Sequence, residues 1–183
     1  FLALRVATLA NIGAYISLNG LNSSTNNLGG LSGLSRTPAI FTRVTGVFSN
    51  SQPTAPYRGA GRPEATFAIE RAIDVAARRL GRDPVALRRR NLIAPDEMPF
   101  NTGFLFTYDS GEFERNMDDA LALADWAGFQ QRRTESAARG KLRGIGLCNA
   151  IEIAAGPITG PLSESAEIRF DSTGSATVTM GTH

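Results

Sequence analysis

The sequence predicts an α+β fold in which mixed or antiparallel strands flank a central helical segment. Near both ends of the chain, apolar residues recur at about every second position, which is the period of a half-buried strand. Between residues 64 and 139 the period lengthens to about 3.6, the period of an amphipathic helix. An order of strands, helices and strands is typical of α+β proteins, in which the sheet is antiparallel or mixed.

Two strands are expected before the helices. Residues 2–18 are apolar and β-branched in partial alternation, which predicts a long strand or a bent hairpin arm, with a bulge at Gly13. Residues 19–33 are rich in Asn, Ser and Gly and predict a flexible loop. Residues 39–49 predict the second strand.

The longest predicted helix covers residues 64–80. Pro63 lies in its first turn and Gly81 follows its last, which matches the preference for proline at helix starts and glycine after helix ends. Its predicted buried face comprises Ala65, Ala68, Ile69, Ala72, Ile73, Ala76 and Leu80, and its predicted solvated face comprises Glu70, Arg71, Asp74 and Arg78.

Three shorter helices follow. Asp83 and Pro84 are typical of an N-cap and a first helical residue, so a short helix is expected directly after them. Residues 112–126 and 129–139 predict the other two helices.

Strand character returns near the C-terminus. Residues 142–155 predict one strand, and residues 164–170 and 176–180 predict two more, joined by a hairpin turn at Asp171-Ser-Thr-Gly174. A change of sub-domain is expected near residue 140.

Composition excludes several classes of protein. The sequence contains one cysteine and one histidine, so no Cys/His cluster can bind zinc or an iron–sulfur cluster. No apolar run approaches the roughly 20 residues that span a bilayer, so no membrane insertion is expected. The net charge is only +2, which does not favour nucleic-acid binding. The sequence therefore predicts a globular protein whose metal chemistry would need a bound cofactor.

An arginine cluster lies on the first two helices and is interleaved with acidic residues. We interpret it as a solvated or ion-paired face rather than an RNA or membrane surface, because no aromatic residues alternate with the arginines. The cluster comprises Arg78, Arg79, Arg82, Arg88, Arg89 and Arg90.

Two single residues near the C-terminus are weaker candidates. Cys148 lies among aliphatic residues, which predicts a buried structural thiol rather than a nucleophile. Glu152 lies in an apolar run that could raise its pKa, although strand alternation could equally expose it.

The stretch Tyr57-Arg58-Gly59-Ala60-Gly61-Arg62-Pro63-Glu64 joins a Ser/Pro/Thr-rich segment to the longest helix. It is a weak match to a dinucleotide-binding loop, because Glu64 replaces the third glycine and no buried strand precedes it. Two interpretations stay open from the residues alone. The glycines could simply let the chain turn into the helix, or the two arginines beside the helix N-terminus could bind an anion.

This stretch, followed by residues 76–84 and 87–93, closely resembles the molybdopterin-binding large subunit of the xanthine dehydrogenase, aldehyde oxidase and carbon monoxide dehydrogenase-like family. The resemblance identifies residues 1–183 as an internal fragment of the molybdopterin-binding domain. It extends to Leu4-Arg5-Val6, Ala10-Asn-Ile-Gly-Ala-Tyr15, Val44-Thr-Gly-Val-Phe48, Thr107-Tyr-Asp-Ser-Gly111 and Arg143-Gly-Ile-Gly-Leu147.

The resemblance implies a catalytic subunit of a molybdenum hydroxylase, which oxidises a small carbonyl or heterocyclic substrate with water as the oxygen source. It implies a molybdenum–molybdopterin cofactor, with iron–sulfur clusters and FAD on partner subunits or domains. The implied assembly is a dimer of heterotrimers. The alternative is a non-catalytic α+β scaffold or binding subunit derived from such an enzyme.

The resemblance also assigns roles within the stretch. Tyr57, Arg58 and Gly59 are expected to bind the cofactor, and Ala60 and Gly61 to border the substrate pocket. Ala60 replaces the phenylalanine that stacks on a purine in xanthine oxidase-type enzymes, and Gly59 replaces the copper-bound cysteine of copper-containing relatives. A purine substrate and copper chemistry are therefore not expected.

No catalytic residue and no direct metal ligand are expected within residues 1–183. The general-base glutamate of the family is expected downstream, together with a Gly-Gln-Gly-His cofactor loop. We therefore predict that this fragment alone neither turns over substrate nor retains cofactor.

Overall fold

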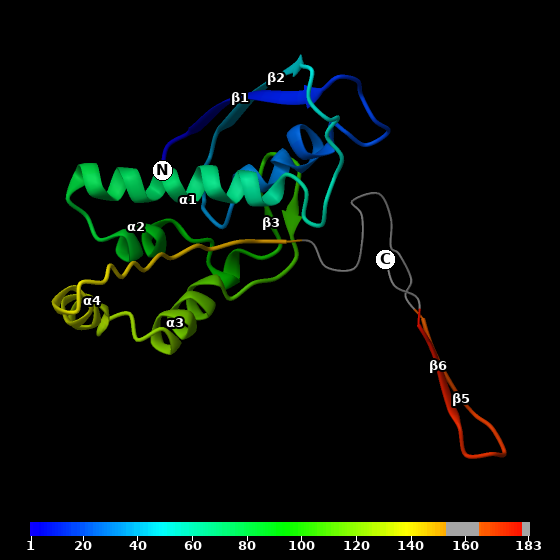
Figure 1. The fold of residues 1–183 in the computed structure, drawn as a ribbon. Coiled ribbons are helices and arrows are strands. Elements are labelled where there is room, and N and C mark those ends of the chain that lie inside the picture. The colour runs from blue at the N-terminus through cyan, green and yellow to red at the C-terminus, as the bar shows by residue number, and fades with distance from the viewer. Residues whose placement is uncertain (153–164, 181–183) are drawn as a thin grey trace. The chain divides into compact units, whose positions relative to one another are not determined.

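The computed structural model describes residues 1–152 and 165–180, with the side chains of residues 26–28 left aside. The chain forms two compact units, Phe1–Ile151 and Glu152–His183. Figure 1 shows helices together with small two-stranded sheets, so the predicted α+β class is confirmed.

The first sheet of the larger unit pairs β1 (Leu4–Gly13) with β2 (Ile40–Phe48) in parallel. Its register shifts between Asn11 and Gly13, which confirms the predicted bulge. Because the strands are parallel and a long connection separates them, the alternative of a hairpin arm for residues 2–18 is wrong.

Helix α1 (Arg62–Leu80) buries one face against this sheet. The cluster beneath it comprises Leu31, Ala65, Ile69 and Ile73, with Leu4, Val6, Val44, Leu87 and Phe104 packed around it.

The predicted boundaries of α1 are close to those observed, but its buried face is rotated. Ala65, Ile69, Ile73 and Ala77 are buried at a spacing of four residues, while Ala68, Ala72 and Leu80 are exposed. Glu70, predicted to be solvated, is buried, and its carboxylate accepts a hydrogen bond from Arg88. Periodicity could not predict this rotation, because it depends on an ion pair with another helix.

The connection from β1 to β2 differs from the flexible loop that the sequence predicted. Residues 19–33, predicted as a flexible loop, contain two 3-10 helices, η1 (Asn22–Ser24) and η2 (Asn26–Ser32). Leu31 is only 2% exposed, and Gly30 lies against Ala65 of α1. Gly30 thus allows η2 to pack closely against α1.

The remaining helices follow the predicted order. Asp83 caps α2 (Pro84–Asn91) by accepting a hydrogen bond from the Ala86 N–H at 2.6 Å, as predicted. The predicted helices in residues 112–126 and 129–139 are confirmed as α3 (Phe113–Leu123) and α4 (Phe129–Ala138). Between α2 and α3 lie η3 (Pro95–Glu97) and a short antiparallel pair, β3 (Phe100–Asn101) and β4 (Thr107–Tyr108).

A second apolar cluster joins α2 and α3. Leu34, Leu92 and Met117 are buried, and Val85, Phe113, Leu121, Leu147 and Ile151 pack against them.

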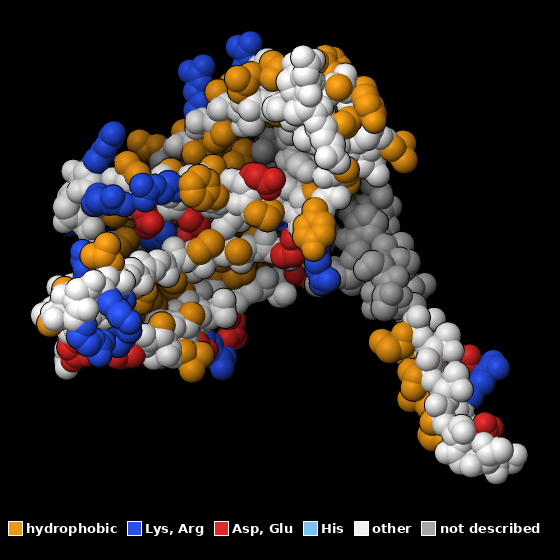
Figure 2. All heavy atoms as spheres, in the orientation of Figure 1, with side chains coloured by type: hydrophobic (Ala, Val, Ile, Leu, Met, Phe, Trp, Pro, Cys, Tyr) orange, Lys and Arg blue, Asp and Glu red, His pale blue; other side chains and the backbone are white. Residues whose placement is uncertain are grey.

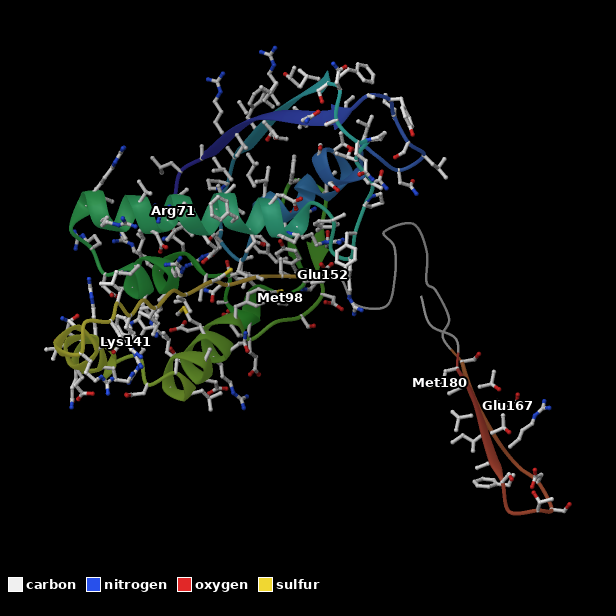
Figure 3. The ribbon with its side chains drawn as sticks, in the orientation of Figure 1. Arg71, Met98, Lys141, Glu152, Glu167 and Met180 are labelled. Carbon is white, nitrogen blue, oxygen red and sulfur yellow. The ribbon has the colours of Figure 1, made fainter. Side chains whose placement is uncertain are left out.

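The predicted strand over residues 142–155 is wrong for the part that the structure describes. Residues 141–152 form no strand there, and residues 153–155 lie outside the described residues. Instead, the stretch that starts at Lys141, labelled in Figure 3, runs along α2 and α3. Its alternation places Leu147 and Ile151 on the second cluster and leaves Cys148 exposed, so the predicted burial of Cys148 is also wrong.

Arg88 of α2 connects these elements. It is only 1% exposed, and its guanidinium donates to Glu70 Oε2 at 2.8 Å, to Asp74 Oδ1 at 2.9 Å and to the Leu147 carbonyl at 3.2 Å. Burial by itself lowers the pKa of this guanidinium, but the two carboxylates outweigh it and raise that pKa above its ordinary value. Arg88 is therefore a buried ion-pair centre and not part of a solvated face.

Arg89, in contrast, matches the interpretation of an ion-paired surface. It donates to Glu114 Oε1 at 2.6 Å and also pairs with Asp118 of α3, and all three side chains are more than a third exposed.

The smaller unit contains the predicted hairpin. β5 (Ala166–Phe170) pairs antiparallel with β6 (Ala176–Met180), and Asp171 Oδ1 accepts from the Thr173 and Ser175 N–H groups in the turn. The predicted start at residue 164 lies outside the described residues. One side of the hairpin is apolar and exposed, as Figure 2 shows: Ala166, Ile168, Phe170, Ala176, Val178 and Met180.

We predict that replacing Arg88 with methionine destabilises the chain strongly. R88M leaves the buried Glu70 carboxylate without its cation, which typically costs roughly 3–5 kcal/mol. Urea unfolding of the 183-residue chain measures the loss. The control is R89M, which breaks an exposed pair and should cost about 1 kcal/mol or less. Equal losses in the two variants would contradict a special role for Arg88.

A second prediction concerns Tyr108, whose hydroxyl donates to the Gly33 carbonyl at 2.8 Å and whose burial raises its pKa to about 12. Because the ordinary pKa of tyrosine is about 10, its contribution to folding is fully present below about pH 10 and lost as the pH rises through about 12. Y108F should lower the free energy of unfolding by about 1 kcal/mol at neutral pH. The difference from the wild type should shrink above about pH 10.

Urea unfolding at a series of pH values tests this expectation. Y15F is the control, because Tyr15 is 65% exposed. A Y108F difference that stays constant into the alkaline range would show that the Tyr108 hydroxyl is not the titrating group.

Candidate functional site

The segment before α1 forms two overlapping turns. The Ala60 N–H donates to the Tyr57 carbonyl at 2.7 Å, and the Arg62 N–H donates to the Gly59 carbonyl at 2.8 Å. The helix starts directly after the second turn, with Gly61 as its N-cap. Residues 57–61 therefore have a defined backbone path, and we call them the 57–61 loop.

Two glycines impose that path. Gly59 has a φ of 76° and Gly61 a φ of 89°, both in the left-handed region. An L-residue there costs roughly 1–2 kcal/mol, because its Cβ crowds the following carbonyl oxygen. The interpretation of the glycines as helix-entrance residues is thus confirmed for the backbone, and it does not exclude a binding role.

The side chains of the loop differ in exposure. Tyr57 is 88% exposed and Arg58 is exposed, whereas Gly59 and Ala60 are half-buried and Gly61 is buried. The loop thus exposes the Tyr57 phenol and the Arg58 guanidinium, while its small residues lie closer to the interior of the protein.

The segment that leads into the loop is fixed to the end of β1 and the connection after it. Ser17 Oγ donates to the Thr54 carbonyl at 2.7 Å, and Thr54 Oγ1 donates to the Gly20 carbonyl at 2.8 Å. Ser49 Oγ donates to Asn11 Oδ1 at 2.7 Å. The loop is therefore held at both ends, by these hydrogen bonds and by α1, so its backbone is preorganised for any group that binds there.

The electrostatics of the loop suit an anionic, oxygen-rich group. Arg58 and Arg62 lie at the N-terminal end of α1, where the helix dipole adds partial positive charge. The Arg62 guanidinium lies over the Phe106 ring, 5.9 Å from its centroid. Within residues 1–152 and 165–180, no group of three or more His, Cys, Asp or Glu could hold a metal ion. Arginine side chains at a helix N-terminus are suited to bind an anionic group such as a phosphate.

The predicted site residues thus lie together because they are consecutive, whereas Cys148 and Glu152 belong to another segment. Both are exposed, and partial desolvation, with nearby Glu70, raises the pKa of the Cys148 thiol, which disfavours a nucleophilic thiolate. Sequence reasoning missed Phe106 and Thr54. The polar run Ser49-Asn-Ser-Gln-Pro-Thr54 could have indicated a segment that hydrogen-bonds to its neighbours. Nothing in the sequence around Phe106 indicates its contact with Arg62.

Comparison with known proteins identifies the family. Residues 1–92 match the profile of the molybdopterin cofactor-binding domain, and residues 119–183 match a second profile of the same description. The chain belongs to the molybdopterin cofactor-binding domain family. The resemblance inferred from the 57–61 loop and the two arginine-rich helices is confirmed.

Relatives of this chain include subunits of oxidoreductases. The carbon monoxide dehydrogenase large chain of Hydrogenophaga pseudoflava is 35% identical and aligns with 99% of this chain and 24% of its own length. The structure of quinoline 2-oxidoreductase from Pseudomonas putida 86 matches with a TM-score of 0.81 and 32% identity, over 98% of this chain and 24% of that chain. Subunit gamma of the 6-hydroxypseudooxynicotine dehydrogenase complex of Paenarthrobacter nicotinovorans is 32% identical over 61% of this chain and 15% of that protein.

These relatives set the scale of the match. The chain spans about a quarter of the length of the carbon monoxide dehydrogenase large chain and of the quinoline 2-oxidoreductase chain. It is homologous to large subunits of molybdenum-dependent oxidoreductases, and such relatives are parts of multi-subunit proteins. Among the described residues, no helix has the length and apolar character that crossing a membrane requires.

We predict that the backbone conformation of Gly61 is needed to hold the proposed cofactor-binding residues of the 57–61 loop in place, and not only for stability. G61A forces an L-residue to adopt a φ of 89°. It should lower both the thermal stability and the molybdopterin content of the full-length subunit. The control is G81A at the other end of the same helix, where φ is 60° and no atom lies within 4 Å of an added Cβ.

G81A should lower stability by a similar amount, roughly 1–2 kcal/mol, and leave the molybdopterin content unchanged. Equal cofactor content in both variants would assign Gly61 a purely structural role.

Proposed function

We propose that this chain is part of the catalytic subunit of a molybdenum hydroxylase, which hydroxylates a small carbonyl or heterocyclic substrate with water as the oxygen source. The preorganised 57–61 loop, at the start of α1 in a molybdopterin cofactor-binding chain, carries this proposal. Arg58 of the loop, Arg62 at the start of α1 and the half-buried Gly59 and Ala60 are suited to hold an anionic cofactor close to the backbone.

Each loop residue has a proposed role toward the cofactor. The exposed Arg58 guanidinium binds an anionic oxygen of the cofactor. The aromatic ring and the hydroxyl of Tyr57 contact the cofactor beside it. Gly59 has no side chain, so the loop backbone can approach the cofactor closely. When bound, molybdenum–molybdopterin supplies the redox centre and the oxygen-transfer chemistry, and the protein positions it.

Ala60 and Gly61 are proposed to border the substrate pocket. Ala60 offers a methyl group where an aromatic ring would stack on a purine, so the proposed substrate is not a purine. Gly59 offers no sulfur for copper, and the only cysteine of the sequence, Cys148, lies on a different segment. We therefore propose a copper-free site.

Electrons must leave through other groups. Residues 1–183, with one cysteine and one histidine, cannot hold iron–sulfur clusters, so we propose that iron–sulfur clusters and FAD on partner subunits or other domains accept the electrons. The proposed assembly is a dimer of heterotrimers. The general base and the remaining cofactor contacts come from outside residues 1–183, which is why the isolated chain is proposed to be inactive.

The decisive variant is R58A in the full-length subunit, purified with its partner subunits. Loss of the cation should reduce molybdenum content, measured by elemental analysis, and reduce turnover in proportion. R133A, an exposed arginine on α4, is the control and should leave both unchanged. Unchanged molybdenum in R58A would refute the proposed role of Arg58. A wild-type subunit without molybdenum would refute the hydroxylase and support the scaffold alternative.

A further inference from the structure

Phe106 lies in the turn that joins β3 to β4, and this turn is fixed by hydrogen bonds. The Phe106 carbonyl accepts two of them from Thr102, from the N–H at 3.1 Å and from Oγ1 at 2.6 Å. Thr102 is buried, and its Oγ1 also accepts from the Phe104 N–H at 3.3 Å. The side chain of Phe106 therefore projects from a backbone of defined conformation.

The backbone of η2 borders both Phe106 and Arg62, the first residue of α1. A Cβ on the buried Gly29 would lie 2.5 Å from Phe106 Cε2, which is closer than Cβ atoms approach other heavy atoms. A Cβ on the buried Gly30 would lie 3.8 Å from Arg62 Cγ, at ordinary contact distance. The Phe106 ring is thus packed directly on η2, and the aliphatic part of Arg62 lies beside the next residue of η2.

Arg62 connects this ring to the 57–61 loop. Its guanidinium carbon lies over the Phe106 ring, 5.9 Å from the centroid, which is within the range of a cation–π attraction. Its backbone N–H donates to the Gly59 carbonyl at 2.8 Å and closes the second turn of the loop. The side chain of Arg62 is therefore held by Phe106, while its backbone holds Gly59.

We propose that Phe106 is a positioning residue of the candidate site and acts through Arg62. The ring keeps the Arg62 guanidinium beside the N-terminus of α1 and keeps the second turn closed, so the loop holds one conformation for the group that it binds. A residue that only filled space on Gly29 could be leucine, whereas attraction for a guanidinium requires the face of an aromatic ring. The proposal rests on the proposed function for the identity of that group.

Hydrogen exchange of the loop amides tests this role. The full-length subunit is purified from cells that do not make molybdopterin, and mass spectrometry follows the peptide that contains the Ala60 and Arg62 amides. F106L keeps an apolar side chain without the ring, and these amides should exchange about three to ten times faster. F106Y keeps the ring and should restore the wild-type exchange. Unchanged exchange in F106L, a rise spread equally over all peptides, or no recovery in F106Y overturns the proposal.

Two further variants test whether the effect passes through Arg62 and is local. In an R62M background, F106L should change the loop exchange by less than about twofold, because the cation is already absent. The matched control F113L removes a ring that packs on the second apolar cluster and meets Tyr108 edge-on, with 6.3 Å between the ring centroids. It should also change the loop exchange by less than about twofold. Equal effects of F106L with and without Arg62, or of F113L and F106L, overturn the proposal.

Molybdenum content separates the positioning of the loop from the proposed chemistry. In the full-length subunit purified with its cofactor and partner subunits, F106L should lower molybdenum content, and F106Y and F113L should not. F106L with faster exchange and full molybdenum content overturns the role of Phe106 in the site. A wild-type subunit without molybdenum, in which F106L still speeds loop exchange, refutes the proposed function and leaves the positioning of the loop intact. A loaded, active complex with unchanged exchange in F106L does the reverse.

Discussion

The buried ion-pair centre around Arg88 is the interaction on which the larger unit depends. It fixes α2 against α1 through Glu70 and Asp74, and it holds the stretch after α4 through the Leu147 carbonyl. A buried guanidinium is tolerated only when its donors are satisfied, and here carboxylates and carbonyls surround it. Because Arg88 lies within the first matched family segment and Leu147 within the second, one side chain joins the two matched parts of the chain.

The same constraint orients the candidate site. Glu70 must face Arg88, so the buried face of α1 is rotated toward α2 and the alanines at 68, 72 and 76 turn outward. Helix α1 then begins where two left-handed glycines end the 57–61 loop. The position of the loop therefore depends on how one helix is seated, because the N-terminus of α1 carries the proposed cofactor contacts.

The sequence predicted the elements that local chemistry determines. The N-cap at Asp83, the bulge at Gly13 and the turn at Asp171 are all confirmed, because each depends on neighbours within a few residues. The sequence-based prediction was wrong where contacts between residues far apart in the chain determine the structure. Residues 142–152 have strand periodicity, yet their partners are helices and a guanidinium. The position of the candidate site in the sequence came from resemblance, and its roles toward cofactor and substrate stay predictions, as does the sub-domain change near residue 140.

The hairpin of β5 and β6 has a practical consequence. A two-stranded hairpin is marginally stable in water, and here six apolar side chains line one exposed side of it. A free strand edge next to such a surface is a template for pairing with other copies. When the hairpin is expressed outside its normal assembly, residues 166–180 would therefore tend to make the protein precipitate. Solubility during purification thus reports whether the apolar side of the hairpin is packed against another protein surface.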